Sequence, residues 1–397
     1  MAARRLTHGR IRAQGALLGL AVLGAVLFAW RAGAFARAES ALVDARFELR
    51  GPIAPHGDIV LVGIDEESSA HFGRRVSSIT RSEYARAVTN LSRGGASLLI
   101  VDVVFAREDP DPAEDAAQAQ ALRESGRVLL VADVSDTNPA YPIERLREEE
   151  TGEGFINLVP DQDGVVRRIP PPRIALHGDE TTMVLPIAAE AAVARAFPDG
   201  PPEVAIEEGV YSFGDLRLET SGGGILINFA GPPGTFPKIP LWRAVEGALP
   251  ADAVRGKIVL LGSMHPLQHD QFSVPFHGSR GAATTFRERT EVSGAEMYGI
   301  EIHAHALDTI LSRRPLVACD RDRQTLFFVA LGLGAGLVFI VLRLKPWPAA
   351  VAALVGIAGW GAGAQSLFTA RGLVVDVLPG ALLVAGAFVT GQMWHRA

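Results

Sequence analysis

The sequence has little of several features that would point to particular classes of protein. It has a single cysteine, Cys319, among 397 residues, which excludes a disulfide bond within one chain. A folded domain of this chain must therefore be stabilised by its core. The formal net charge is −6, without a long run of basic residues, which argues against nucleic acid as a partner. No internal repeat and no low-complexity tract is visible.

Motifs of common catalytic and nucleotide-binding sites are also missing. In the stretch RGKIVLLG, Ala251 stands where a phosphate-binding loop needs its first glycine, and Ile258 stands where it needs Ser or Thr. The stretch SGGGIL at 221–226 lacks the G-x-S-x-G pattern of a nucleophile elbow. We therefore expect no enzymatic activity, no catalytic residue and no cofactor in this chain.

Metal-ligating residues do not form a recognisable site. The D-x-D-G of Asp161–Gly164 would place Val159 and Pro170 at the first and twelfth positions of a calcium loop, and neither side chain can bind calcium. The Asp-Gly pair between apolar segments predicts a tight hairpin instead. The histidines of HPLQHD (265–270) and HAH (303–305) follow no zinc spacing, so we expect capping or surface roles and no metal site.

Hydrophobic residues are concentrated near the two ends of the chain. The mean hydropathy is +0.20 although 21% of the residues are charged, a combination typical of membrane spans joined to a folded domain. Four apolar segments predict a transmembrane bundle of four spans, and few ionisable groups interrupt them, which gives little support to a channel or transporter. The predicted spans are residues 13–36, 324–342, 348–369 and 373–393.

The distribution of basic residues predicts the orientation of these spans. Arginines precede the first span, and Arg343 and Lys345 lie between the second and third. The positive-inside rule then places residues 1–12 and 394–397 in the cytoplasm, and residues 37–323 outside it. The sequence ARA at 36–38 could be the cleavage site of a signal peptide, but the preceding apolar core is longer than signal peptides have. We therefore expect an uncleaved anchor.

The extracytoplasmic region has the pattern of an α/β domain. Apolar runs at 58–65, 97–105, 128–134 and 256–262 predict strands of a largely parallel sheet that is covered on both faces. We predict helices within 82–96, where Gly94 and Gly95 end the helix, and at 111–124, 183–197 and 299–311, and antiparallel hairpins in addition.

Polar residues on the last of these helices have a helical spacing. Glu301 and His305 are four residues apart, and Asp308 follows three residues later, so a solvated face or a cap explains them. His303 falls on a different face of the same helix.

Most of the chain resembles a known family, the CHASE type 2 extracellular sensory domain of bacterial transmembrane receptors. The stretches that carry the resemblance are DARFELRG (44–51), DIVLVGIDEES (58–68), GGASLLIVDVVF (94–105), INLVPDQDGVVRRIP (156–170), ILINFAGPPGTF (225–236), RGKIVLLGSM (255–264), HDQFSVPF (269–276) and YGIEIHAHALDTIL (298–311). Three spans after the domain also look like that family. The resemblance implies a sensor in the bacterial inner membrane, with a large periplasmic or extracellular domain.

The chain departs from the family in two places. Members usually have a Trp/Pro-rich element before the first helix, whereas residues 74–86 contain neither residue type. Members also usually continue into a cytoplasmic adenylate cyclase or kinase, and this chain ends in GQMWHRA. The chain is then either a sensor that acts through a separate cytoplasmic or membrane partner, or the receptor half of a longer enzyme. A non-sensing scaffold of a membrane complex is the third possibility.

A ligand of such a sheet is expected beyond the carboxyl ends of its parallel strands. By that rule the candidate ligand-binding residues are Asp65, Glu66, Asp102, Ser263 and Asp270. Asp102 lies in a Val-rich run, so a hydrogen bond in the core explains it as well. The ligand is an unidentified small molecule or cue.

The spans carry three G-x-x-x-G patterns, which begin at Gly15, Gly332 and Gly359. Such spacing lets helices approach closely in the lipid bilayer. It is consistent with a homodimer and equally with packing inside the bundle.

Overall fold

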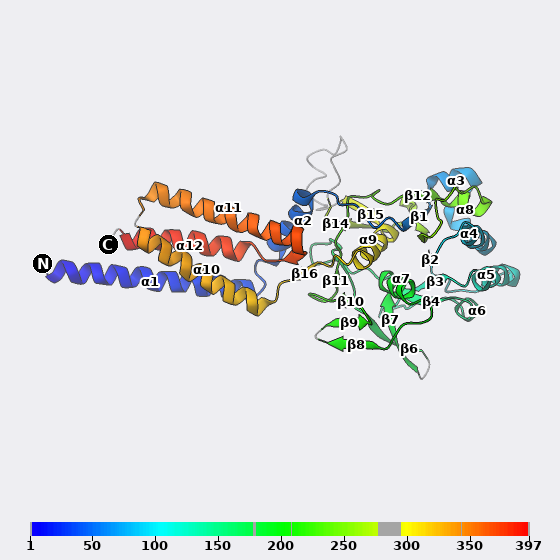
Figure 1. The fold of residues 1–397 in the computed structure, drawn as a ribbon, viewed down its shortest axis with the longest axis horizontal. Helices are drawn as coiled ribbons and strands as arrows, with labels where there is room; N and C mark the ends of the chain where they lie inside the picture. Colours follow the sequence, from blue (N-terminus) through cyan, green and yellow to red (C-terminus); the bar gives the residue numbers. More distant parts are fainter. Residues whose placement is uncertain (1, 178–179, 208, 277–294, 343, 396–397) are drawn as a thin grey trace. The chain divides into compact units, whose positions relative to one another are not determined.

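The computed structural model describes residues 2–177, 180–207, 209–276, 295–342 and 344–395. These residues form two compact units, Gly51–Pro315 and a helical unit made of Met1–Arg50 and Leu316–Ala397. Figure 1 shows the order of the elements along the chain. Each unit is described below by itself.

An eight-stranded sheet forms the centre of the unit 51–315. Its order is β12 (Lys238–Pro240), β1 (Ile59–Ile64), β13 (Ile258–Ser263), β2 (Leu98–Asp102), β3 (Val128–Ala132), β4 (Gly152–Phe155), β7 (Glu180–Pro186) and β6 (Arg173–His177). Neighbours are parallel except for the antiparallel pair β6–β7. The predicted α/β class with a largely parallel sheet is thus confirmed.

Helices cover both faces of this sheet, which is why its strands are continuously apolar. On one face, α4 (Arg81–Arg93), α5 (Pro112–Ser125) and α8 (Leu241–Glu246) share a core with alternate residues of β1 such as Val60 and Val62. On the other, α7 (Ile187–Ala196) and α9 (Gly299–Leu311) contact each other and the sheet. The remaining helices of this unit are short: α3 (Glu66–Phe72), η1 (Val76–Ser78), α6 (Glu144–Arg147) and η2 (Pro266–Gln268).

Small antiparallel sheets complete the unit and confirm the predicted hairpins as a class. They are β8 (Val204–Glu207) with β9 (Val210–Phe213) and β10 (Leu216–Glu219), β5 (Arg168–Ile169) with β11 (Ile225–Leu226), and β14 (Gln271–Val274) with β15 (Ala295–Tyr298).

Two local predictions need correction. The helix expected from Met183 begins at Ile187, because Pro186 restricts the residue before it to an extended conformation and residues 180–186 form β7. Asp161–Gly164 does form a tight turn, in which Gly164 has a φ of 83° and donates to the Asp161 carbonyl. The flanking strands β4 and β5 do not pair with each other, so the turn does not close a hairpin.

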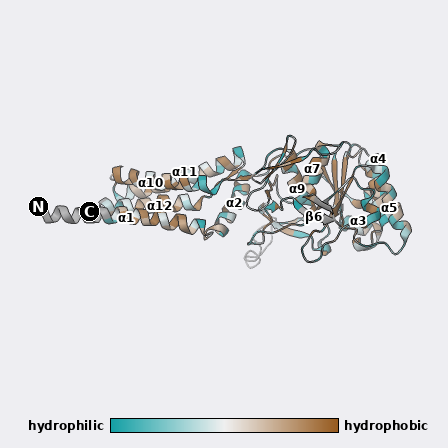
Figure 2. Cartoon of the chain, turned by 90° about the horizontal axis from the view of Figure 1, so that it is seen from below, coloured by the Kyte–Doolittle hydropathy of each residue, from teal (hydrophilic) through white to brown (hydrophobic). Residues whose placement is uncertain are grey.

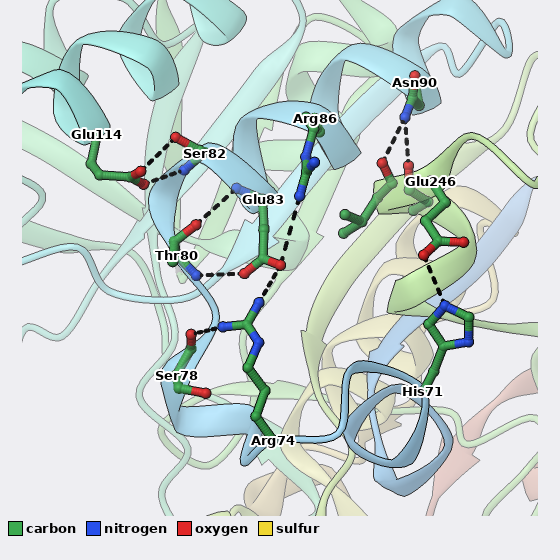
Figure 3. Close-up of polar contacts among 12 residues, drawn as sticks. His71, Arg74, Ser78, Thr80, Ser82, Glu83, Arg86, Asn90, Glu114 and Glu246 are labelled. Carbon is green, nitrogen blue, oxygen red and sulfur yellow. Dashed lines mark hydrogen bonds and ion pairs between the residues drawn. The ribbon is translucent and has the colours of Figure 1, made fainter.

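The segment that lacks the family's Trp/Pro-rich element is held by polar contacts at the start of α4 (Figure 3). Thr80 and Glu83 form a reciprocal capping box. The Glu83 carboxylate also pairs with Arg74 and lies 3.7 Å from Arg86. Charged and capping interactions therefore fix this segment.

The helical unit contains α1 (Ala2–Arg31), α2 (Ala36–Arg50), α10 (Arg321–Leu342), α11 (Pro346–Arg371) and α12 (Leu378–His395), with the short strands β16 (Val317–Ala318) and β17 (Leu373–Val374). Figure 2 shows how hydrophobic residues dominate α10, α11 and α12. In the described residues, three helices are long and apolar enough to cross a membrane, namely α1, α10 and α11. The helix α12 is apolar but shorter, since β17 takes the first residues of the predicted fourth span.

Polar contacts join the ends of these helices. The Glu39 carboxylate of α2 accepts from the backbone N–H groups of Val377 and Leu378, which begin α12. Trp30 Nε1 donates to Asp376 Oδ2 at 2.6 Å, and Arg31 pairs with Asp322 at 2.7 Å. The N-terminal and C-terminal helices are thus connected by side chains as well as by packing.

The first G-x-x-x-G pattern packs inside this unit. A β-carbon at Gly15 or Gly19 would lie 3.8 or 3.7 Å from atoms of Thr390 on α12. A β-carbon at Gly359 or Gly363 would meet no atom of another element within 4 Å among the described residues.

Candidate functional site

A pocket of about 370 Å³ lies at the carboxyl ends of β2 and β13. Three of the five predicted ligand-binding residues, Asp102, Ser263 and Asp270, line it together. The other lining residues are Ile156, Leu158, Gln268, Phe272, Gly299 and His303. The pocket thus has polar groups from several segments and apolar walls, which is the usual composition of a small-molecule site.

Two glycines allow the close approach that forms this pocket. Gly262 on β13 is paired with Asp102, and a β-carbon there would lie 2.8 Å from Asp102 Cβ and 2.9 Å from Ile300 Cδ1. A β-carbon at Gly299 would lie 2.7 Å from Asp270 Oδ1. Any larger residue at either position would push α9 or a carboxylate out of place.

The two carboxyl groups have altered acidities. Burial, with a smaller contribution from the charge of Asp270, raises the pKa of Asp102 to about 7. Burial also raises the pKa of Asp270, whereas a hydrogen bond from the backbone of Gly299 at the start of α9 opposes this. Asp102 therefore changes its charge near neutral pH, a property found at many functional sites.

His303 and Ser263 add polar atoms without partners. His303 is only 3% exposed, and burial lowers the pKa of its imidazole to about 4, with a backbone contact to Ile156 acting in the opposite direction. Its Nδ1 and the Ser263 hydroxyl have no hydrogen-bond partner among the described residues. Buried polar atoms without partners are uncommon, and a bound ligand is one way to satisfy them.

Asp65 and Glu66 are not among the residues that line this pocket. Asp65 caps α3 by accepting from the Ser68 backbone N–H at 2.9 Å, and it pairs with Lys238 at 3.0 Å. Glu66 is exposed in the first turn of that helix. The pocket geometry therefore gives these two predictions no support.

The polar residues of α9 are buried, which corrects the expectation of a solvated face. Glu301, His305 and Asp308 are at most 3% exposed. Glu301 accepts from the Gly234 and Thr235 backbones, His305 Nδ1 accepts from the Ala230 backbone, and Asp308 accepts from the His56 backbone at 2.5 Å. The alternative of capping was closer, since these side chains satisfy N–H groups of neighbouring loops.

Sequence reasoning missed His303 and the apolar walls of the pocket. In the sequence, His303 is distinguished only by lying on a different face of its helix from Glu301 and His305. The residues Ile156, Leu158 and Phe272 lie in loops or short strands. As for other histidines, His265 caps η2 by accepting from the Leu267 backbone at 3.2 Å, as predicted. No group of three metal-ligating side chains occurs in the described part of the chain.

The raised pKa of Asp102 predicts a pH-dependent stability. The folded state holds the Asp102 proton more tightly than the unfolded state, so wild-type stability should fall as pH rises from about 4 to about 7 and then level off. Asp102→Asn removes this loss and should stabilise the chain at pH 8 by roughly 1–3 kcal/mol, less than the full shift because the carboxyl group is partly exposed. Thermal unfolding of both proteins at several pH values would measure this difference in stability. The exposed change Asp252→Asn is the control, and parallel wild-type and Asp102→Asn curves would contradict the assignment.

Comparison with known proteins places the chain in a family. The family model of the CHASE2 domain matches residues 20–341, which is most of the chain. Neither the curated proteins nor the solved structures include a match. The chain therefore belongs to the CHASE2 domain family of extracellular sensory domains.

Proposed function

We propose that the chain is a sensor anchored in the bacterial inner membrane. In this proposal, the unit 51–315 lies outside the cytoplasm, binds a small ligand in the pocket at its carboxyl edge, and changes the state of the helical unit. A separate cytoplasmic or membrane protein receives the signal, and the chain itself has no enzymatic activity. The polar, partly unsatisfied pocket supports a sensor over a scaffold.

The single observation that carries the proposal is the position of α9. Gly299 and His303 on its first turns line the pocket. Near its other end, Asp308 accepts from the backbone of His56, in the segment that follows α2. The residues after α9 lead to α10, and the Arg314 carbonyl among them accepts from Asn228 at 2.9 Å. The helix α9 therefore lines the pocket, accepts a hydrogen bond from the segment that follows α2, and is continuous with the residues that lead to α10.

A ligand transmits a signal only if it binds two conformations with different affinity. In this proposal, occupation of the pocket moves α9, and α9 moves the two connections. The four-span arrangement is part of the proposal, with α12 as the fourth span. In this proposal a second copy of the chain contacts Gly359 and Gly363 on α11, where an added β-carbon would meet no atom of another element within 4 Å in the part of the chain that is described.

Cysteine labelling tests the membrane arrangement. In a Cys319→Ser background, Asp136→Cys at a side chain that is 96% exposed should react with a membrane-impermeant maleimide in intact spheroplasts. A cysteine appended after Ala397 should react only after permeabilisation, because four spans return the chain to the cytoplasm. Labelling of the appended cysteine from outside would contradict four spans, and protection of Asp136→Cys would contradict an extracytoplasmic domain.

The native cysteine tests the coupling. Cys319 precedes α10, so its reactivity reports on that connection. Gly262→Ala, which forces Asp102 or Ile300 to move, should change the rate of Cys319 alkylation at least about 2-fold if the pocket and the connection are coupled. Gly57→Ala adds the same methyl group into open space and is the control. Equal rates in all three proteins would contradict coupling.

A further inference from the structure

The charges of the pocket narrow the class of its ligand. Asp102 and Asp270 both line it, and no Lys or Arg is among the described residues that line it. Two other buried carboxylates of this unit have cationic partners: Asp65 pairs with Lys238, and Asp115 pairs with Arg81 at 2.6 Å. A backbone hydrogen bond from Gly299 partly offsets the burial of the carboxylate only for Asp270. Among the described residues, the pocket therefore lacks the cationic side chain that Asp65 and Asp115 each have beside them.

The polar atoms without partners also favour a ligand that donates hydrogen bonds. His303 is 97% buried, as its 3% exposure shows, and the lowered pKa of its imidazole keeps the ring neutral. A neutral imidazole and a serine hydroxyl can each accept one hydrogen bond, and ionised carboxylates only accept. His303, Ser263, Asp102 and Asp270 together thus form a site with surplus acceptors, which suits a ligand with several N–H donors.

The size and walls of the pocket favour an organic cation over a metal ion. Ile156, Leu158 and Phe272 give it apolar surface that a metal ion would not use. Calcium takes six to eight oxygen ligands, and the described residues offer no group of three metal-ligating side chains. A volume of about 370 Å³ is at the small end of ligand pockets.

We propose that this pocket binds a small primary amine in its ammonium form, with the nitrogen near Asp102 and Asp270 and a short apolar body against Ile156, Leu158 and Phe272. This inference rests on the proposed sensory function and names the chemical class of its ligand. The ammonium group supplies three donors and one positive charge. It thereby supplies the positive charge and the hydrogen-bond donors that the described lining residues do not supply.

Binding of simple amines to the full chain in nanodiscs tests the proposal. n-Butylamine and 1,4-diaminobutane should raise the thermal midpoint saturably at pH 7.5, whereas 1-butanol and butyrate of similar length should not. Asp102→Asn should weaken amine binding at least about 10-fold, because a charge-assisted hydrogen bond is lost. Asp252→Asn, which removes a charge from an exposed ion pair, should leave binding unchanged.

The pH dependence gives a second readout. The titratable groups of the pocket are Asp102, Asp270 and His303. An ammonium ligand competes with the proton on Asp102, so its affinity should increase as pH rises from 5.5 to 7.5, and this increase should be reduced in Asp102→Asn.

Any of three other results would overturn the proposal that the ligand is an amine. Equal shifts by 1-butanol or butyrate would show a pocket without preference for a cation, and a shift by Ca²⁺ or Mg²⁺ alone would show a metal site. Absence of binding by both amines in the folded chain, at concentrations up to about 50 mM, would also overturn it, since even tiny ligands reach useful affinity in a matched pocket. The cysteine experiments use no amine, so the sensory function and the amine proposal fail independently.

Discussion

The contact of α9 with the carboxyl end of β13 is the constraint on which the rest of the structure depends. It requires glycine at 262 and 299, because a β-carbon at either position would come within 2.9 Å of existing atoms. This approach brings His303 and Gly299 beside Asp102 and Asp270, which belong to other segments. Without it, the carboxyl edge of the sheet would carry separate side chains instead of a pocket.

The buried polar residues of α9 have a cost that their partners offset. Burying a carboxylate or imidazole without hydrogen bonds is strongly unfavourable. Glu301, His305 and Asp308 avoid this by accepting from the backbones of loops that have no partner in the main sheet. The helix therefore organises the loops around 56 and 228–235, and these loops in turn keep the helix in place. The same contacts connect the pocket with both ends of the sensory unit.

The sequence predicted the parts of the fold that depend on local pattern. Continuous Val, Ile and Leu runs identified β1, β2, β3 and β13, because a strand buried on both faces has few other compositions. The burial of α9 was missed because polar residues on several of its faces resemble a solvated helix. The strand β7 was missed because its residues 183–186 were read as the start of a helix, and the restriction imposed by Pro186 was not applied.

The candidate site was predictable to the extent that it follows from strand ends. Adjacent parallel strands bring Asp102 and Ser263 to one edge, as the crevice rule predicts. The same rule also selected Asp65, yet Lys238 and the start of α3 occupy that carboxylate. His303, Ile156 and Phe272 come from other elements, whose positions depend on tertiary packing that a single sequence does not display.

The central claim is that α9 and the loops bound to it form one unit that joins the pocket to both connections. Native-state hydrogen exchange of the full chain in nanodiscs tests it at the amides that donate to α9 side chains: His56, Ala230, Gly234 and Thr235. If the claim holds, these amides exchange with the same opening free energy as the backbone of α9 itself. Fast exchange of the His56 amide while the backbone of α9 stays protected would contradict the claim. The pocket would then have no firm contact with the chain that follows α2.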